Sequence, residues 1–405
     1  MIPMNDVEYL LGNFERFSPL REPPYSKRAL DFFGALAQVL RADPAVKAFP
    51  DLAAFAFWCR PANLARMKTT LDTRKRLGRG TVFHIAPSNV PMNFAYSLAF
   101  GLLAGCANIV RVPGGDFPQI DSFVRAWRSV LEKDDFALFR DKTLLVRYGH
   151  DDEITGRFSA RCDARVIWGG DETIQRIRRL PIPPQGVEIT FADRYSFALM
   201  NPAAVEQLGE PEWERLCDRF TNDALMMGQR ACSSPHLIVW IGEKSPAGRE
   251  RFWRGVARSA SRFPIEPSRV MDRFVRLCGN AIDFETQGTL EWFGGKRLGT
   301  VRLAALPERL DALRGDFGLF YEYDAENLDT LALRITEKFQ TAVCFGVEPE
   351  TVADWVIKNR LRGIDRIVPV GSALSIGPIW DGFDIVGTLS RIVSDSEIYR
   401  SGNKT

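Results

Sequence analysis

Residues 82–112 read VFHIAPSNVPMNFAYSLAFGLLAGCANIVRV, and between Ile85 and Val110 this stretch contains no Asp, Glu, Lys or Arg. An uncharged run of this length could cross a bilayer, but Pro87, Pro91 and several Ser, Asn and Gly residues interrupt it. A strand, a turn, a buried helix and a second strand account for it better, because a parallel sheet covered on both faces produces such runs. The stretch therefore predicts an α/β fold without a membrane span.

The same alternation of short apolar runs and amphipathic runs continues as far as Met200. Strands joined through helices in this order form a parallel sheet that carries helices on both faces. The residues before this series have helical patterns, at 27–41 and 52–66. Within the series we predict strands at 82–86, 108–112, 143–148, 165–168, 187–191 and 195–200, with helices at 93–104, 119–132 and 171–179.

A second unit is expected to begin after Pro202 with a helical segment at 206–227. Its sheet would use strands at 237–241, 300–303, 319–323 and 342–347. At roughly 150 residues a domain, the chain is long enough for two or three domains. We expect residues 1–201 together with 366–405 to form one domain, to which the tail returns unless it makes an oligomer contact, and residues 202–365 to form the other.

The composition excludes several classes of protein. With 45% hydrophobic and 26% charged residues among 405, the chain is of the globular type. Its net charge is only +2, with 53 basic and 51 acidic residues, which disfavours nucleic acid as a partner. The seven cysteines have no metal-ligand spacing, so we expect no metal site and a reducing compartment. The N-terminus has no signal-peptide pattern, which predicts a cytoplasmic protein.

One cysteine lies where a nucleophile is commonly held. Residues 228–236 read GQRACSSPH, which places Cys232 in a loop of small residues between a predicted helix and a predicted strand. Most intracellular cysteines are inert buried residues, so this context alone leaves both roles open for Cys232. Far upstream, residues 86–91 read APSNVP, where a turn projects the Asn89 amide. A thiol and an amide donor that meet at one carbonyl are the parts of covalent acyl chemistry.

Three loops follow predicted strands of the first sheet, where parallel sheets bind ligands. Each loop also has a purely structural interpretation. The loop at 87–91 could be a rigid turn, and Arg111 could be an ordinary exposed cation. The loop at 168–173 could be an ordinary helix start with acidic residues in its first turn. The third loop could instead hold a phosphate at the helix N-terminus, although it lacks a Gly-x-Gly-x-x-Gly fingerprint. The candidate cofactor-binding residues in these loops are Pro87, Ser88, Arg111, Pro113, Gly169, Gly170, Asp171 and Glu172.

Several motifs carry a resemblance to known enzymes. PSNVP at 87–91 resembles the Pro-Trp-Asn-Phe-Pro motif of the aldehyde dehydrogenase superfamily, and GQRAC at 228–232 resembles its Gly-Gln-x-Cys motif. More closely, the chain is similar to the LuxC-type acyl-CoA reductases, the fatty-acid reductases of bacterial bioluminescence and their relatives. The resemblance is dense from about residue 80 to 242 and rests on HIAPSN (84–89), GLLAG (101–105), NIVR (108–111), WGGDE (168–172), RYSF (194–197) and ACSSPH (231–236).

This resemblance implies an aldehyde-dehydrogenase-like fold, with a Rossmann-type nucleotide-binding domain at 1–201 plus 366–405 and an α/β catalytic domain at 202–365 that carries Cys232. It implies that Cys232 takes the acyl group from a thioester and that NADPH reduces the enzyme thioester to an aldehyde. The Asn89 amide and the Cys232 N–H would stabilise the oxyanion.

The chain departs from the superfamily at two positions. Arg111 replaces the Lys that usually holds the nucleotide ribose, and its fork suits a phosphate, which favours NADPH with NADH as the alternative. The Glu-Leu-Gly-Gly-Lys motif survives at most as EITF at 188–191. Glu188 is therefore either a third catalytic candidate or an ordinary surface residue. Because a reductase needs no hydrolytic water, this points away from aldehyde oxidation.

The expected substrate is an acyl-CoA or an acyl group on a carrier protein, and the resemblance implies a homo-oligomer and an acyl-activating partner enzyme. Two other functions stay open. Cys232 could serve an acyltransferase or thioesterase without nicotinamide, with His236 as its base, although His236 has the structural reading of a buried strand residue. The chain could also be a catalytically silent relative that acts as a scaffold.

Overall fold

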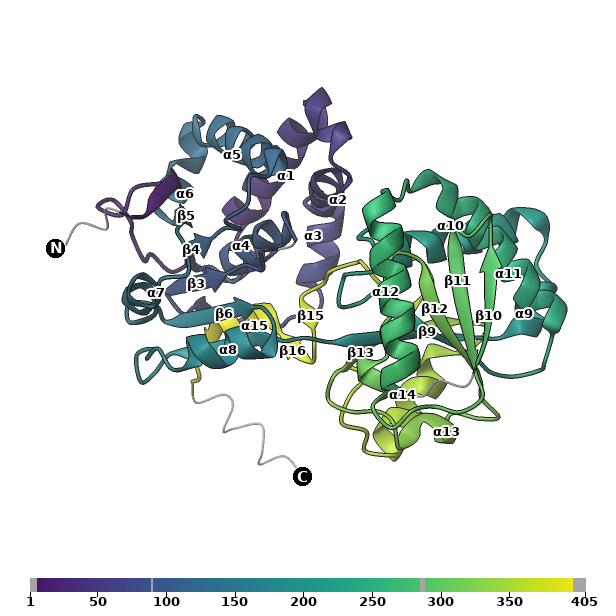
Figure 1. The fold of residues 1–405 in the computed structure, drawn as a ribbon. Coiled ribbons are helices and arrows are strands. Elements are labelled where there is room, and N and C mark those ends of the chain that lie inside the picture. Colours follow the sequence, from purple (N-terminus) through teal and green to yellow (C-terminus); the bar gives the residue numbers. More distant parts are fainter. Residues whose placement is uncertain (1–5, 89, 285–287, 396–405) are drawn as a thin grey trace. The chain divides into compact units, whose positions relative to one another are not determined.

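The computed structural model describes residues 6–88, 90–284 and 288–395, and the chain divides into two compact units. The first unit comprises residues 1–192 and 376–405, and the second comprises residues 193–375. Each unit is built on one mostly parallel sheet with helices packed on it (Figure 1). Among the described residues, no helix has the length and apolar character needed to cross a membrane.

The sheet of the first unit has six strands in the order β1-β5-β4-β3-β6-β7. Strands β3 to β7 are parallel, and β1 runs antiparallel to β5 at one edge. Strands β4 and β5 lie on one side of β3, and the later strands β6 and β7 lie on its other side, so the strand order reverses at β3. The strands are β1 (Glu8–Leu11), β3 (Thr81–Ile85), β4 (Ala107–Arg111), β5 (Thr143–Arg147), β6 (Ala164–Trp168) and β7 (Val187–Phe191).

Helices cover both faces of this sheet. On one face α7 and α8 place Phe158 and Ile177 against Phe83 and Ile109, and elsewhere in the unit α1 and α5 pack Phe32 against Trp127. The helices are α1 (Lys27–Ala42), α2 (Pro50–Trp58), α3 (Pro61–Lys68), α4 (Asn93–Leu103), α5 (Pro118–Leu131), α6 (Ala137–Asp141), α7 (Asp152–Ser159), α8 (Asp171–Arg178) and α15 (Ile385–Leu389). Short pairs are formed by β2 (Arg76–Gly78) with β17 (Ser390–Ile392), and by β15 (Ile379–Trp380) with β16 (Phe383–Asp384).

The sheet of the second unit has seven strands in the order β10-β11-β12-β9-β8-β13-β14. All neighbours are parallel except β10 and β11. The strands are β8 (Tyr195–Met200), β9 (Pro235–Trp240), β10 (Gly288–Phe293), β11 (Leu298–Leu303), β12 (Leu319–Asp324), β13 (Phe339–Phe345) and β14 (Arg366–Pro369). The helices are α9 (Pro202–Glu206), α10 (Glu210–Leu225), α11 (Pro246–Ser259), α12 (Pro267–Asp283), α13 (Asp329–Ala332) and α14 (Pro349–Lys358).

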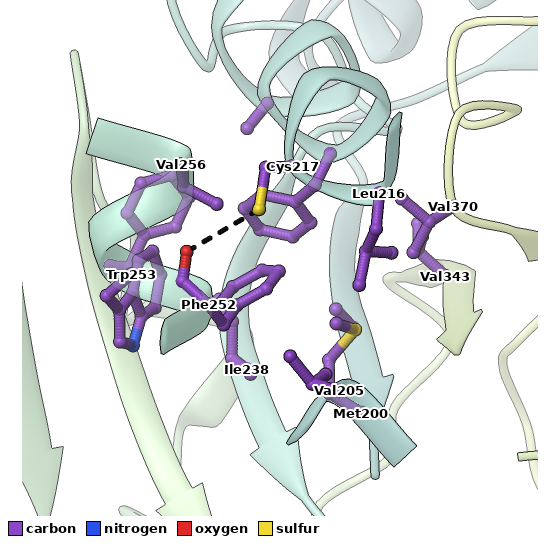
Figure 2. Close-up of a cluster of buried hydrophobic side chains, with 14 of the residues drawn as sticks. Met200, Val205, Leu216, Cys217, Ile238, Phe252, Trp253, Val256, Val343 and Val370 are labelled. Carbon is purple, nitrogen blue, oxygen red and sulfur yellow. Dashed lines mark hydrogen bonds between the residues drawn. The ribbon is translucent and has the colours of Figure 1, made fainter. Parts of the chain in front are cut away.

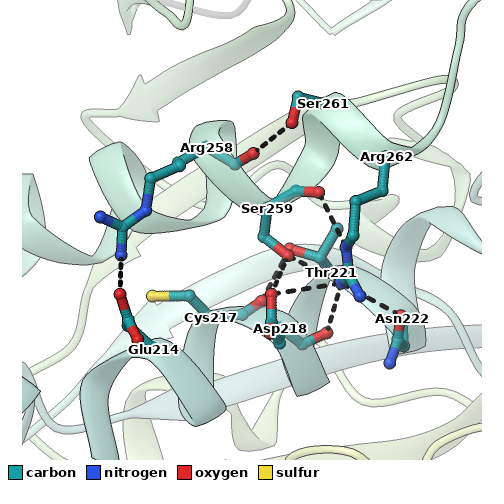
Figure 3. Close-up of polar contacts among 9 residues, drawn as sticks. All are labelled: Glu214, Cys217, Asp218, Thr221, Asn222, Arg258, Ser259, Ser261 and Arg262. Carbon is teal, nitrogen blue, oxygen red and sulfur yellow. Dashed lines mark hydrogen bonds and ion pairs between the residues drawn. The ribbon is translucent and has the colours of Figure 1, made fainter. Parts of the chain in front are cut away.

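Apolar side chains buried between α10, α11 and the sheet hold α10, the helix that leads into the Cys232 loop. Figure 2 shows this cluster, in which Phe252 and Ile238 are fully buried and Cys217 is 2% exposed. On the outer side of the two helices, Arg258 pairs with Glu214 at 2.9 Å and Arg262 lies on Asp218 at 3.3 Å (Figure 3). Exposed ion pairs of this kind contribute at most about 1 kcal/mol each. The buried cluster therefore holds α10 in place, and the ion pairs add only a small stabilisation.

Most predicted elements are confirmed to within a residue or two, one predicted helix is divided, and another begins later than predicted. The predicted helix at 52–66 is interrupted between α2 and α3, because Pro61 has no N–H to continue the first helix and begins the second. The predicted helix at 206–227 begins as α10 at Glu210, after Gly209 as N-cap.

The division of the chain differs from the predicted 1–201 plus 366–405 and 202–365. Strand β8, which was predicted to belong to the first domain, pairs with β9 and β13 of the second sheet. Residues 366–369, which the predicted division assigned to the returning tail, form β14 and pair with β13. The tail joins the first unit only from Ile376 onward. Sheet membership depends on partners distant in sequence, which local patterns do not specify.

Candidate functional site

Two of the seven cysteines are accessible to a substrate. Five thiols are buried, Cys232 is half-buried and Cys278 is exposed. Burial raises the pKa of Cys162, Cys217 and Cys344 to about 12, so these three are unreactive protonated thiols near neutrality. The nucleophile predicted from the sequence is thus one of two candidates that the structure leaves.

Cys232 lies in a tight loop between α10 and β9. The loop turns through two consecutive left-handed residues, Gly228 with φ +61° and Gln229 with φ +65°. Gly228 adopts this conformation without strain, whereas a residue such as Gln229 is held there by its surroundings. Inside the loop Ser234 donates its hydroxyl to the carbonyl oxygen of Asp223, at 2.9 Å. The loop is therefore tied back to the helix that precedes it.

Gln229 fastens this loop to strand β12. Its side chain is 1% exposed, and its Nε2 donates to the carbonyl oxygens of Pro235 (3.2 Å) and Leu319 (2.9 Å). Its Oε1 accepts from the Gly318 N–H at 3.0 Å. One buried amide thus satisfies three backbone groups, which explains a Gln three positions before Cys232.

Gln229→Leu is expected to destabilise the second unit by about 3 kcal/mol. The leucine is similar in size but leaves the Gly318 N–H and the Leu319 carbonyl buried without partners, each at a cost of about 1–3 kcal/mol. The measurement is the free energy of urea unfolding. Arg230→Gln is the matched control, because that side chain is 46% exposed and should change stability by less than about 1 kcal/mol. Equal stability of Gln229→Leu and wild type would contradict this role.

The Cys232 sulfur accepts a hydrogen bond from a residue that sequence reasoning missed. Nε2 of Gln340, a fully buried residue of β13, lies 3.3 Å from Sγ. Gln340 Oε1 accepts from Thr341 Oγ1 at 3.2 Å, and Thr341 Oγ1 accepts from Arg366 Nη1 at 3.1 Å. Because a guanidinium can only donate, the Thr341 hydroxyl must donate onward to Oε1, and this leaves Nε2 to face the sulfur. A chain of donors thus runs from a cation to the thiol.

The main chain of Cys232 is held by the neighbouring strand. Ser196 Oγ donates to the Cys232 carbonyl oxygen at 2.7 Å and accepts from the Thr341 N–H at 3.2 Å. Ser196, Thr341 and Arg366 all lie at the amino-terminal ends of their strands, and Cys232 precedes β9 at the same edge. The thiol therefore lies at the amino-terminal edge of this sheet. The general rule for parallel sheets places ligands at the other edge, at the carboxyl ends of the strands.

His236 is not built as a base. It is 5% exposed, and its ring stacks on Tyr195 with centroids 5.5 Å apart. Burial, and more weakly the charge of Arg314, lowers the pKa of His236 to about 3. The structural reading of this histidine as a buried strand residue is confirmed.

The predicted cofactor-binding residues that are described lie along the carboxyl edge of the six-stranded sheet. Arg111 ends β4, while the other loops follow β3 and β6, the strands at which the order reverses. Such a reversal is where doubly wound sheets bind nucleotides. After β3, Pro87 is half-buried and Ser88 exposed; after β4, Pro113 is buried; after β6, Gly169 is half-buried, and Gly170, Asp171 and Glu172 are exposed. Asn89 lies outside the described residues.

Arg111 is a partly buried cation held by neutral groups. Its Nη2 donates to the carbonyl oxygens of Tyr148 (3.3 Å) and Gly149 (2.9 Å), and its guanidinium lies 4.7 Å from the Tyr148 ring centroid. Burial lowers the pKa of Arg111, and the charge of Arg176 lowers it further. Such a group gains from an anionic ligand, so this donor set fits a nucleotide phosphate.

The start of α8 also fits a nucleotide. Gly170 is the N-cap and provides no side-chain hydrogen bond, and a Cβ there would meet nothing within 4 Å. The helix start is thus open beside this N-cap. Asp171 and Glu172 oppose a phosphate at the same place, and carboxylates suit ribose hydroxyls better. We therefore expect the ribose near α8 and a phosphate near Arg111.

Glu188 is engaged by two arginines. It lies in β7, where its carboxylate contacts Arg165 at 2.5 Å and Arg178 at 2.8 Å. Arg165 is 2% exposed, so this carboxylate balances a buried cation. The geometry gives Glu188 a structural task, and its catalytic role stays a prediction. Among the described residues, no group of three or more His, Cys, Asp or Glu side chains could hold a metal ion.

A family model described as Acyl-CoA reductase (LuxC) matches residues 6–259 of this chain. No curated protein matches this chain.

Solved structures match at low sequence identity. The bifunctional proline utilization A (PutA) protein matches with a TM-score of 0.62 and 15% identity over 91% of this chain and 42% of that one. An NAD-dependent benzaldehyde dehydrogenase from Corynebacterium glutamicum matches with a TM-score of 0.57 and 14% identity over 91% and 84%. A lactaldehyde dehydrogenase matches with a TM-score of 0.58 and 10% identity over 85% and 78%. The chain thus spans less than half of the PutA protein, and these likenesses show an aldehyde-dehydrogenase-like α/β fold, as predicted.

Proposed function

Because the chain belongs to the LuxC family of acyl-CoA reductases, we propose that it reduces an acyl thioester of coenzyme A or of an acyl carrier protein to the aldehyde, with NADPH as the reductant. The observation that carries this proposal is the half-buried Cys232 thiol, held in a fixed loop with the Gln340 amide donating to its sulfur.

Cys232 supplies the covalent step. Its thiolate attacks the carbonyl carbon of the acyl thioester, the carrier thiolate leaves and takes up a proton, and the acyl group remains on Sγ as an enzyme thioester. The nicotinamide, when bound, supplies the hydride that reduces this carbonyl. The thiohemiacetal on Sγ then collapses to the aldehyde and regenerates the thiolate. We assign stabilisation of the oxyanion in both halves to the Asn89 amide, as predicted from the sequence.

Gln340 donates a hydrogen bond to the proposed nucleophile. A neutral donor at the sulfur, backed by Arg366 through Thr341, favours the thiolate over the thiol. Gln340→Leu is therefore expected to raise the pKa of Cys232 and to slow its alkylation by iodoacetamide at least about fivefold at pH 7, since one hydrogen bond contributes roughly 1 kcal/mol.

This effect is measured as the alkylation rate of the Cys232 peptide against pH, with the Cys278 peptide of the same sample as an internal reference. Thr341→Val should shift the Cys232 profile in the same direction by a smaller amount. An unchanged profile in Gln340→Leu would exclude the hydrogen bond as a cause of thiol reactivity, whether or not the chain reduces acyl thioesters.

Arg111 is proposed to select NADPH. Arg111→Met removes the cation at the edge of the first sheet but keeps an apolar stem over Tyr148. Because a charge-assisted contact to phosphate is worth about 1.5–3 kcal/mol, KM for NADPH should rise at least tenfold, with a much smaller rise for NADH. An equal rise for both cofactors would show that Arg111 does not read the 2′-phosphate.

The alternative of an acyltransferase or thioesterase without nicotinamide needs a base beside the thiol. His236 is a weak base with a pKa of about 3 and is occupied by stacking on Tyr195. Its geometry does not support that alternative. A silent scaffold would need no reactive thiol. In that case Cys232 should be alkylated no faster than the exposed Cys278.

The proposed function is tested by mixing the protein with NADPH and acyl-CoA thioesters of increasing chain length. NADPH consumption is followed by absorbance, and the aldehyde is trapped as a hydrazone. Equal amounts of oxidised cofactor and trapped aldehyde are expected with at least one thioester. Acyl transfer to Cys232 without any NADPH oxidation, with coenzyme A and carrier-protein substrates alike, would overturn the reductase in favour of the acyltransferase.

A further inference from the structure

Helix α12 (Pro267–Asp283) presents its apolar side chains to solvent. Met271 is 62% exposed, Phe274 55%, Val275 63% and Ile282 76%. These positions recur at helical spacing and form one continuous stripe, to which the exposed Cys278 also belongs. A surface helix of a globular protein normally buries such a stripe against its own core.

The face that α12 turns inward is polar and specifically bonded. Arg273, 3% exposed, donates to the carbonyl oxygens of Lys296 (2.8 Å) and Arg297 (2.6 Å). Asn280, 5% exposed, donates to the carbonyl oxygen of Arg314 at 2.8 Å. Rotating the helix to bury its apolar stripe would leave these buried carbonyl oxygens without partners. The outward orientation of the stripe is therefore built into the fold of the second unit.

The exposed surface continues onto the neighbouring strand. In Figure 1, α12 lies along one face of the second unit, where its Leu277 packs into the core beneath it. The Arg273 guanidinium lies 5.3 Å from the ring centroid of Trp292 in β10, the edge strand of the sheet. Trp292 is 36% exposed and Leu290, two residues earlier, 41%. The apolar stripe of α12, with Leu290 and Trp292 on the strand beside the helix, marks an interaction site, unlike single exposed apolar residues.

The order of residues along the stripe is complementary to itself. In an antiparallel pair of α12 helices related by a two-fold axis at Arg276, residues at equal distances on either side of Arg276 face each other. Apolar residues then meet apolar ones. The facing pairs are Val270 with Ile282, Met271 with Ala281, and Phe274 with Cys278. A two-fold interface requires this kind of self-complementarity.

We propose that α12 is a surface through which two copies of this chain associate, antiparallel, about a two-fold axis near Arg276. At about 1.5 Å per residue, the 17-residue helix spans roughly 25 Å. One helix pair buries less than the ~800 Å² per partner of a stable complex, so the contact depends on protein concentration and includes Leu290 and Trp292. A lipid surface fits less well, because the charged residues on the side of the stripe, Asp272, Arg276 and Asp283, provide no excess of cations for anionic lipids.

The first test measures the association of the full chain by sedimentation over about 1–100 µM, a range that brackets weak protein contacts. Phe274→Asp should weaken dimerisation at least tenfold, since it places a charge in the contact. Leu333→Asp is the matched control, because Leu333 is an 89% exposed apolar residue outside α12 and should leave dimerisation unchanged. A wild-type monomer throughout this range, or equal weakening by both variants, overturns the proposal.

The second test fixes the register. Phe274→Cys should form disulfide-linked dimers with the native Cys278 of the other copy, and Phe274→Cys with Cys278→Ser should not. Wild-type chains should cross-link poorly, because their Cys278 residues are offset by about 6 Å along the axis and also separated across the helix pair, which together exceed the ~7 Å reach of a disulfide. Cross-linking that persists without Cys278 contradicts the register. Sedimentation with vesicles of anionic lipid that depends on Phe274 would assign the face to a lipid surface instead.

Discussion

Cys232→Ala is expected to lower NADPH-dependent aldehyde formation by about 10⁴-fold or more, since loss of a covalent nucleophile removes the path that the rest of the site supports. The fold should survive this change. Alanine keeps the carbonyl oxygen that accepts from Ser196, and the loop stays attached through Gln229. The Gln340 amide loses one acceptor, at a cost of roughly 1 kcal/mol. The measurement is turnover with the best acyl-CoA substrate.

Cys278→Ala serves as the control for this experiment. That thiol is exposed on α12 and belongs to no part of the proposed reaction, so turnover should remain within about twofold of wild type. Turnover above about 1% in Cys232→Ala, or a comparable loss in Cys278→Ala, would remove Cys232 from the centre of the mechanism. Binding of NADPH by Cys232→Ala, followed by fluorescence, separates loss of chemistry from loss of the folded site.

The sequence predicts the sheet strands well because their signals are local. The predicted strand at 82–86 and the observed β3 at 81–85 differ by one residue, since a short apolar run bounded by turn residues defines itself. Assignment of strands to sheets is less predictable. Strand β8 follows β7 closely in sequence but pairs with strands of the other unit, and local periodicity does not encode this choice.

Some motif residues behind the family resemblance are structural. His84 is fully buried between Ser97 Oγ (2.7 Å) and Asn108 Oδ1 (2.8 Å). A Cβ at Gly101 would collide with the Asn108 side chain, so this helix position must be glycine for α4 to approach β4. Trp168 donates from its indole to the same Ser97. In this chain the three motif residues build the first unit, which gives these motif positions a structural task.

The candidate nucleophile was found from the sequence, but the residue that donates to its sulfur was not. Cys232 lies in a loop with a recognisable composition, whereas Gln340 lies 108 residues later in an apolar strand. The one available signal was the polar pair Gln340–Thr341 within the run FQTAVCF, since buried polar residues in a strand need partners. Only the pairing of β8 with β9 and β13 brings that pair to the thiol.

Acidification is expected to weaken the first unit before the second. Burial lowers the pKa of His84 from 6.5 to about 4 and that of His236 from 6.5 to about 3. Both imidazoles stay neutral in the folded chain while the unfolded chain takes up protons below pH 6.5. The stability present above pH 6.5 is therefore lost as the pH falls toward each folded pKa. At 1.36 kcal/mol per unit, the loss reaches about 3 kcal/mol for His84 and about 5 kcal/mol for His236.

Asp223 delays this loss in the second unit. Burial raises its pKa from 3.8 to about 6, so the folded chain takes up this proton first and gains about 3 kcal/mol as the pH falls from 6 to 4. That gain offsets most of the His236 loss until about pH 4, whereas nothing comparable acts on His84 among the shifted groups described in the first unit.

Urea-dependent hydrogen exchange, corrected for the intrinsic rate, reports the stability of each unit through its own peptides. His84→Gln, which can keep both hydrogen bonds, should abolish the early loss in the first unit, and His236→Gln should not. Earlier loss in the second unit, or an unchanged first unit in His84→Gln, would contradict the neutral buried imidazole as the cause.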